Sequence, residues 1–170
     1  MTKYIALLRA VNVGGTGKLA MSELKEMCRE AGFARVETYI ASGNVVFDSE
    51  AAPPLVKAEL EGRLLAYFGK PVGVVVRSAA EMLAVMQANP FTNAEPKFTH
   101  VIFLDEPPPA DAITRATGHE DEQIRIGERE IFVHYVSGRG RSKLRIPAAR
   151  AGTARNMNTV AKLVEIASRP

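Results

Sequence analysis

Short apolar runs and stretches of helical spacing alternate along the first 77 residues. The run at residues 4–8 is continuously apolar, which predicts a central strand buried on both faces. The same criteria predict a helix at 21–31, a hairpin of strands 35–40 and 44–48, a helix from Pro53 to Phe68, and a strand at 72–76. This β-α-β-β-α-β order predicts the split βαβ arrangement of a ferredoxin-like fold.

The second half repeats part of this order. Ser78 to Glu81 has the S-x-x-E spacing of a capping box, which predicts a connecting helix. Further patterns predict a strand at 100–104, a short helix at 111–116, a hairpin of strands 123–127 and 130–136, and helices at 142–150 and 156–168. We therefore expect an α+β chain with a ferredoxin-like half at 1–77, a connecting helix and loop at 78–98, and a second, related α+β half with C-terminal helices at 99–170.

Composition supports a folded chain in a reducing compartment. Of 170 residues, 46% are hydrophobic and 24% are charged, as in globular proteins. The single cysteine excludes an internal disulfide and a multi-thiolate metal site. The N-terminal apolar run lacks a basic flank and a cleavage site, and no apolar run reaches the ~20 residues of a membrane span. We expect a cytoplasmic protein that does not bind membranes.

Charge is distributed unevenly along the chain. Residues 78–137 carry 4 Lys/Arg and 10 Asp/Glu, whereas residues 138–170 carry 8 Lys/Arg and 1 Asp/Glu. A basic end beside an acidic middle indicates binding of anions or nucleic acid, or complementary packing within the chain or between subunits.

A glycine-rich segment at residues 12–18 is similar to a phosphate-binding loop but departs from it twice. Asn12 stands where the P-loop needs glycine, and Leu19 stands where it needs a hydroxyl residue for magnesium. Nucleotide hydrolysis is therefore not expected. A tight strand-to-helix connection with positive φ explains the glycines, and an anion-binding loop is the alternative.

A basic segment at residues 139–155 offers a second candidate for anion binding. Thr153 or Asn156 is a natural cap for the helix that follows, but capping does not explain Arg155. A guanidinium suits a carboxylate or phosphate, so Arg155 is the best single candidate. The full predicted ligand-binding set is Arg9, Asn12, Gly14, Gly15, Lys18, Arg141, Lys143, Arg155 and Asn156.

No catalytic or metal-binding pattern is visible in the spacing of reactive residues. The three histidines, His100, His119 and His134, lie apart without a paired ligand. Cys28 falls on the apolar face of a predicted helix, and Ser42 falls in a hairpin turn. We expect no metal and no cofactor, and no catalytic residue is assigned.

Four segments resemble the domain-of-unknown-function family 1697, a group of small, mostly bacterial proteins. They are residues 9–15 (RAVNVGG), 39–47 (YIASGNVVF), 89–91 (NPF) and 153–160 (TARNMNTV), where Met157 replaces a common tryptophan. The resemblance spans almost the whole chain. It implies an α+β fold with ferredoxin-like topology in at least one half, and it implies no reaction.

Three functions remain open. The first is a non-catalytic binding or interaction protein with a small-anion site. The second is nucleic-acid binding through residues 139–155, although the strands lack the aromatic signature of RNA-recognition motifs. The third is an enzyme acting on a phosphorylated or carboxylated metabolite. The sequence does not define the oligomeric state.

Overall fold

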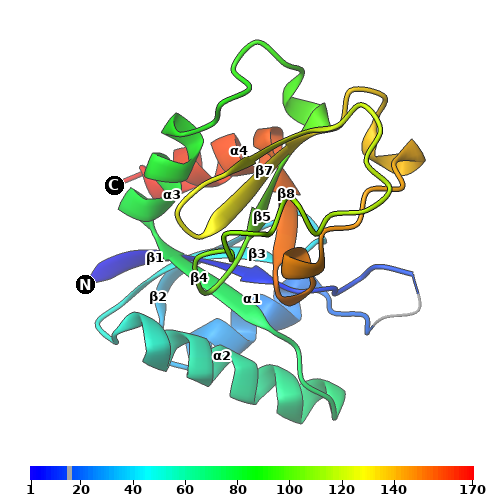
Figure 1. Cartoon of the computed structure of the whole chain (residues 1–170). Helices are drawn as coiled ribbons and strands as arrows, with labels where there is room; N and C mark the ends of the chain where they lie inside the picture. The colour runs from blue at the N-terminus through cyan, green and yellow to red at the C-terminus, as the bar shows by residue number, and fades with distance from the viewer. Residues whose placement is uncertain (15–16) are drawn as a thin grey trace. The chain divides into compact units, whose positions relative to one another are not determined.

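The chain folds into two compact units, shown in Figure 1. This computed structural model describes residues 1–14 and 17–170. Unit 1 comprises Met1–Met82 together with Leu163–Pro170, and unit 2 comprises Leu83–Lys162. Both ends of the chain therefore belong to unit 1.

Unit 1 is built on an antiparallel four-stranded sheet, sheet A, with the strand order β2-β3-β1-β4. Its elements are β1 (Thr2–Leu8), α1 (Met21–Glu30), β2 (Ala34–Tyr39), β3 (Asn44–Ser49), α2 (Pro53–Phe68) and β4 (Val74–Ser78). This element order and strand order are those of the ferredoxin-like fold, so the prediction for the first half is confirmed.

Helices α1 and α2 cover one face of sheet A. Tyr4, Ala6 and Leu8 of β1 join apolar side chains of both helices in one buried cluster. The alternate residues Ile5 and Leu7 are also fully buried. Strand β1 is thus buried on both faces, as its continuous apolar run predicts.

Helix ends in this part of the chain follow their sequence signals. Two prolines begin α2, and Gly69 ends it in the left-handed conformation with φ 72°. Before α3 (Ala79–Gln87), the Ser78 N–H donates to Glu81 Oε1 at 2.8 Å, and the Glu81 N–H donates to Ser78 Oγ at 3.1 Å. The predicted capping box is confirmed.

Unit 2 contains a second antiparallel four-stranded sheet, sheet B, with the strand order β6-β7-β5-β8. Its strands are β5 (Thr99–Phe103), β6 (Gln123–Ile126), β7 (Glu130–His134) and β8 (Thr153–Asn156). Helix α4 (Met157–Ala167) begins in unit 2 and belongs to unit 1 from Leu163 onward. Sheet B repeats the strand order of sheet A, but no α-helix connects β5 to β6 or β7 to β8. The second half is therefore an incomplete structural copy of the first half.

Two predicted helices of the second half are wrong. Residues 111–116 form turns, and residues 142–150 contain only part of a 3₁₀ helix at Pro147–Ala151. Thr117 and Arg145 exchange two backbone hydrogen bonds, of 2.9 and 2.8 Å, which hold Arg145 in a bridge instead of a helix. Strand β8, which pairs with β5, was not predicted either.

Both sheets place a buried arginine at the same register position of the last strand. Arg77 of β4 lies opposite Ile5 of β1, and Arg155 of β8 lies opposite Val101 of β5. The two arginines are 1% and 6% exposed. In each unit the residue after the arginine caps the helix that follows. The repeated pattern therefore extends from strand order to individual residues.

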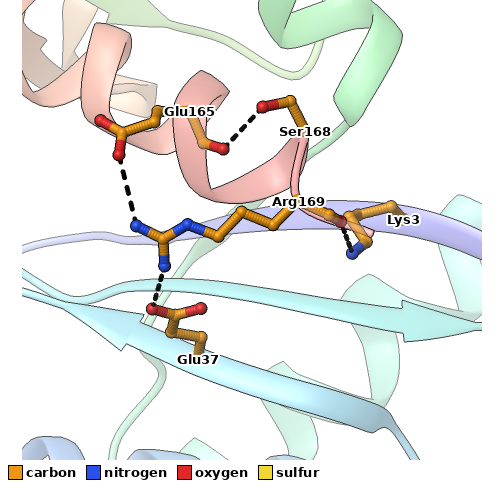
Figure 2. Close-up of polar contacts among 5 residues, drawn as sticks. All are labelled: Lys3, Glu37, Glu165, Ser168 and Arg169. Carbon is orange, nitrogen blue, oxygen red and sulfur yellow. Dashed lines mark hydrogen bonds and ion pairs between the residues drawn. The ribbon is translucent and has the colours of Figure 1, made fainter.

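The C-terminal segment is attached to strands β1 and β2 of its own unit, as Figure 2 shows. Arg169 Nη1 pairs with Glu37 Oε1 at 2.9 Å, and its Nη2 pairs with Glu165 Oε1 at 3.3 Å. Lys3 Nζ donates to the Arg169 carbonyl at 3.3 Å.

Arg169→Ala should lower the free energy of unfolding by less than about 1 kcal/mol. All three charged side chains of the ion pair network are about half exposed, so water already solvates them. Urea unfolding of the variant checks this value. A loss above about 2 kcal/mol would show that the segment is a major source of stability.

Candidate functional site

A cavity of about 210 Å³ lies on one face of sheet B, within unit 2. We call it the sheet B cavity. Most of its lining residues have an apolar side chain or none, and the two polar side chains are those of Tyr135 and Arg139. The other lining residues are Ile102, Leu144, Ile146, Ala149, Gly152 and Ala154.

The cavity occupies the sheet face that helices cover in unit 1. Ile102 and Ala154 face each other across β5 and β8, as Ala6 and Val76 do across β1 and β4. In unit 1 that face is packed against α1 and α2. In unit 2 it is covered by the segments that precede β6 and β8, which contain no α-helix. The cavity therefore lies on the face where sheet B lacks the two α-helices that cover sheet A.

Gly152 allows the last covering segment to approach the sheet. A Cβ atom at this position would lie 2.5 Å from the carbonyl oxygen of Phe103 and 2.7 Å from Leu104 Cδ2. Only glycine permits such an approach to backbone. The close contact forms one wall of the cavity.

Tyr135 and Arg139 are the polar groups of the site. Burial raises the pKa of the Tyr135 phenol, and the nearby Arg139 guanidinium offsets only part of that effect. The phenol is therefore a protonated hydrogen-bond donor at neutral pH. Arg139 is exposed while lining the cavity, so its charge lies at the opening.

His100 adjoins the cavity on the same sheet face. It is two residues before Ile102 on β5, and its ring meets Tyr135 edge-on, with centroids 5.2 Å apart and planes at 85°. Burial, and secondarily the Arg139 charge, lowers the pKa of His100 to about 4. The imidazole is therefore neutral at physiological pH.

A carboxylate holds the two covering segments together. Glu122 accepts hydrogen bonds from the Ser142 hydroxyl and from the Glu120 N–H, the second at 2.8 Å. These hydrogen bonds lower the pKa of Glu122. The contact fixes the loop that carries Arg139.

Glu122→Gln should cost about 1–2 kcal/mol of stability at neutral pH. The pKa of Glu122 is lower in the folded state than in the unfolded chain. The ionised carboxylate therefore stabilises the fold at pH values above its unfolded-state pKa, and this stabilisation is lost as the pH falls through its folded-state pKa. Urea unfolding at neutral and acidic pH measures the difference between variant and wild type, which should shrink below about pH 4. A difference that stays constant with pH would contradict this role.

The predicted residues of unit 1 gather in the loop after β1, where Arg9 and Lys18 are exposed. Asn12 has φ 56°, and its side-chain amide donates to the carbonyls of Leu19 and Ala41, at 2.7 and 2.8 Å. Its Oδ1 accepts the Leu19 N–H at 2.8 Å. Asn12 therefore holds the loop closed, as expected of a tight connection with positive φ.

The two predicted glycines of this loop differ in what the structure describes. Gly14 has φ 23°, and nothing lies within 4 Å of an added Cβ. Gly15 lies outside the described residues.

The predicted residues of unit 2 divide into exposed and buried pairs. Arg141 and Lys143 are exposed on the loop that also carries Arg139. Arg155 is buried, and its Nη1 donates to Thr153 Oγ1 at 2.7 Å and to the Ala154 carbonyl at 2.9 Å. Burial lowers the pKa of Arg155 to about 10, so it stays charged at neutral pH. Asn156 Oδ1 accepts the Thr159 N–H at 3.0 Å and caps α4.

Sequence reasoning missed Tyr135, Arg139 and His100 as members of one site. His100 carries a usable signal, because a histidine occupies a position of the strand pattern that otherwise faces the core. Arg139 lies in the basic segment 139–155, but Tyr135 carries no signal, since the cavity depends on where the loop after β7 crosses the sheet.

Other reactive groups have structural surroundings. Cys28 is fully buried in unit 1, and burial raises its pKa to about 12, so the thiol is not activated. Over residues 1–14 and 17–170, no three His, Cys, Asp or Glu side chains are grouped as a metal site would require. No helix within these ranges is long and apolar enough to span a bilayer.

The fold and the cavity define an α+β protein with two sheets of ferredoxin-like strand order, of which only the first carries both connecting helices. Residues 1–132 match the family described as "Protein of unknown function (DUF1697)", and the chain belongs to this family. The resemblance noted in the sequence is thereby confirmed.

A solved structure is similar over nearly the whole chain. The conserved bacterial protein SP0830 from Streptococcus pneumoniae is 25% identical, with a TM-score of 0.81 over 98% of this chain and 99% of that one. No curated protein matches the chain. The family and its solved relative thus support the α+β fold and an uncharacterised function.

Proposed function

We propose that this protein is a non-catalytic binding protein whose sheet B cavity holds the carboxylate of a small organic anion with an apolar body. The observation that carries the proposal is one exposed guanidinium, Arg139, beside one buried phenol, Tyr135, in a cavity of about 210 Å³ whose other lining residues have an apolar side chain or none. Few polar groups in an apolar lining are typical of small-molecule sites. A guanidinium fork matches a carboxylate.

The exposed residues predicted from sequence support the same function. Arg141 and Lys143 lie on the loop of Arg139 and add positive potential that attracts anions. Arg9 and Lys18, with Gly14 and Gly15, remain a second proposed place of anion contact on unit 1. The side chains of Asn12, Arg155 and Asn156 bond to the fold itself, so we assign them structural support of these loops.

The protonation of the site favours binding over catalysis. A general acid or base works best with a pKa near the working pH. The pKa of His100 is about 4 and that of Tyr135 is raised, so both move away from neutrality. Arg155 is on β8 next to Ala154, whose side chain faces the cavity, and successive strand residues face opposite sides. This placement on the opposite sheet face is a further reason to prefer binding in the cavity over an enzyme site centred on Arg155.

Calorimetric titration with benzoate, phenylacetate and isovalerate tests the proposal, with benzamide as the uncharged analogue. We expect saturable binding of at least one carboxylate. Arg139→Gln should weaken it ~10- to 100-fold, the value of a charge-assisted hydrogen bond. Tyr135→Phe should weaken it ~3- to 10-fold.

Arg141→Gln is the matched control, because it removes the same charge from the same loop without touching the cavity lining. The carboxylate affinity of this variant should stay within about twofold of the wild-type affinity. Binding of no carboxylate, equal binding of benzamide, or equal effects of the two arginine substitutions would each refute the proposal.

A second candidate is nucleic-acid binding, which the exposed basic segment favours. Its exposed cations are Arg139, Arg141, Lys143, Arg145 and Arg150. Such binding should weaken steeply as salt rises. Gel shifts with single- and double-stranded probes over a salt series measure it, and the absence of any shift at low salt would exclude it.

A further inference from the structure

His100 has a buried ring nitrogen that the fold does not satisfy. The side chain is 9% exposed, and among the described residues its Nδ1 has no hydrogen-bond partner. Tyr4 occupies the equivalent position of β1, and its hydroxyl donates to the Ala51 carbonyl at 2.8 Å. Buried polar atoms are nearly always paired, so an unpaired one needs an explanation.

The position of His100 supplies that explanation. Its ring lies against Tyr135, which lines the sheet B cavity, and it shares a sheet face with Ile102 and Ala154 of the lining. A group bound in the cavity beside Tyr135 is therefore next to the imidazole. A ligand in the sheet B cavity can supply the hydrogen-bond partner that His100 Nδ1 lacks.

The charged group that acts on His100 is positive. Arg139 is the charged group that acts on it directly, while Glu122 acts on the neighbouring Tyr135. Asn156, its partner across β8, is uncharged. Burial and the Arg139 charge both oppose an imidazolium in the empty protein. A bound carboxylate neutralises the Arg139 charge and places a negative charge near the imidazole, which favours the imidazolium.

We propose that binding of a carboxylate in the sheet B cavity is coupled to the uptake of one proton by His100, so that imidazolium and guanidinium hold the anion together. The proton passes from solvent to the imidazole, and no other bond changes. This inference rests on the proposed function and adds its regulation by pH.

The sign of the coupling follows from linkage. A complex that binds more protons than its components becomes more stable as pH falls. Benzoate stays ionised above about pH 5, so loss of its own charge does not enter. Benzoate affinity should therefore rise as pH falls from about 7.5 to about 5.5, with a slope that approaches tenfold per pH unit.

Calorimetry of wild-type protein with benzoate near pH 6, in buffers of different ionisation enthalpy, counts the protons taken up. We expect between about 0.5 and 1 proton for each benzoate. His100→Asn keeps a polar group without the titration, so it should abolish both the uptake and the pH dependence while retaining the effect of Arg139→Gln. If this variant does not fold, the titration of the His100 Cε1 proton by NMR, with and without benzoate, replaces it.

The outcomes separate the two claims. Binding that depends on Arg139 without proton uptake, or with an unmoved His100 titration, overturns the coupling and leaves the proposed function in place. Binding of no carboxylate overturns both. Proton uptake that persists in the His100→Asn variant would show that another group takes up the proton.

Discussion

Arg155→Ala should lower the free energy of unfolding by about 3 kcal/mol. The side chain is 6% exposed on β8, and its Nη1 supplies hydrogen bonds to Thr153 Oγ1 and the Ala154 carbonyl. Truncation removes these donors and leaves a cavity inside the unit. Urea unfolding followed by circular dichroism measures the loss.

Two further variants isolate the cause. Arg155→Met retains most of the buried volume without the charge, so it should recover about half of the loss. Arg141→Ala removes an exposed arginine of the same unit and should change stability by less than about 0.5 kcal/mol. Benzoate affinity of folded Arg155→Ala should match that of wild type. A stable Arg155→Ala protein that no longer binds the anion would instead restore Arg155 as a ligand residue.

Acidification from about pH 6.5 to about pH 4 should destabilise the protein by about 2 to 3 kcal/mol through His100 alone. The pKa of His100 falls from an ordinary 6.5 to about 4 on folding. Between these values the unfolded chain binds the proton and the folded chain does not. Stability is therefore complete above about pH 6.5, declines below it, and stops declining through this group below about pH 4.

His100→Phe should remove this slope, because phenylalanine fills the position and cannot bind a proton. Urea unfolding at several pH values compares it with wild type. His134→Gln on β7 serves as the control and should retain the slope. A wild-type protein whose stability stays level across this pH range would show that the buried imidazole is charged or solvated. The Glu122 contribution is lost only at lower pH, so the two effects are separable.

Much of the fold could be predicted because local and tertiary preferences agree. The apolar run of β1, the prolines and Gly69 around α2, and the reciprocal bonds of Ser78 and Glu81 each act within a few residues. Strand order in unit 1 then follows from the ferredoxin-like arrangement. The helix predicted at residues 142–150 was wrong because Arg145 forms a β-bridge with Thr117. These two residues are far apart in the sequence, so the local pattern does not reveal their pairing.

The predicted site residues show the same division between local signals and long-range contacts. Arg155 stands out in sequence as a cation that capping does not explain, but the sequence does not reveal that β8 buries it beside Val101. Asn12 was a reasonable ligand candidate from its glycine-rich surroundings, yet its amide bonds the backbone of Leu19 and Ala41. Polar residues near glycines serve loop closure as readily as ligands.

Periodicity and short motifs were enough to predict the α+β class, the first ferredoxin-like half, the helix caps and the membership of an uncharacterised family. The assignment of the C-terminal segment to unit 1 and the lack of two α-helices over sheet B could be read only from the folded chain. The same is true of the cavity that Tyr135 and Arg139 line, and of the packing of His100 against Tyr135. The reason is physical: burial, cavities and pKa values depend on which distant segments cover a sheet face, and that information is not local in the chain.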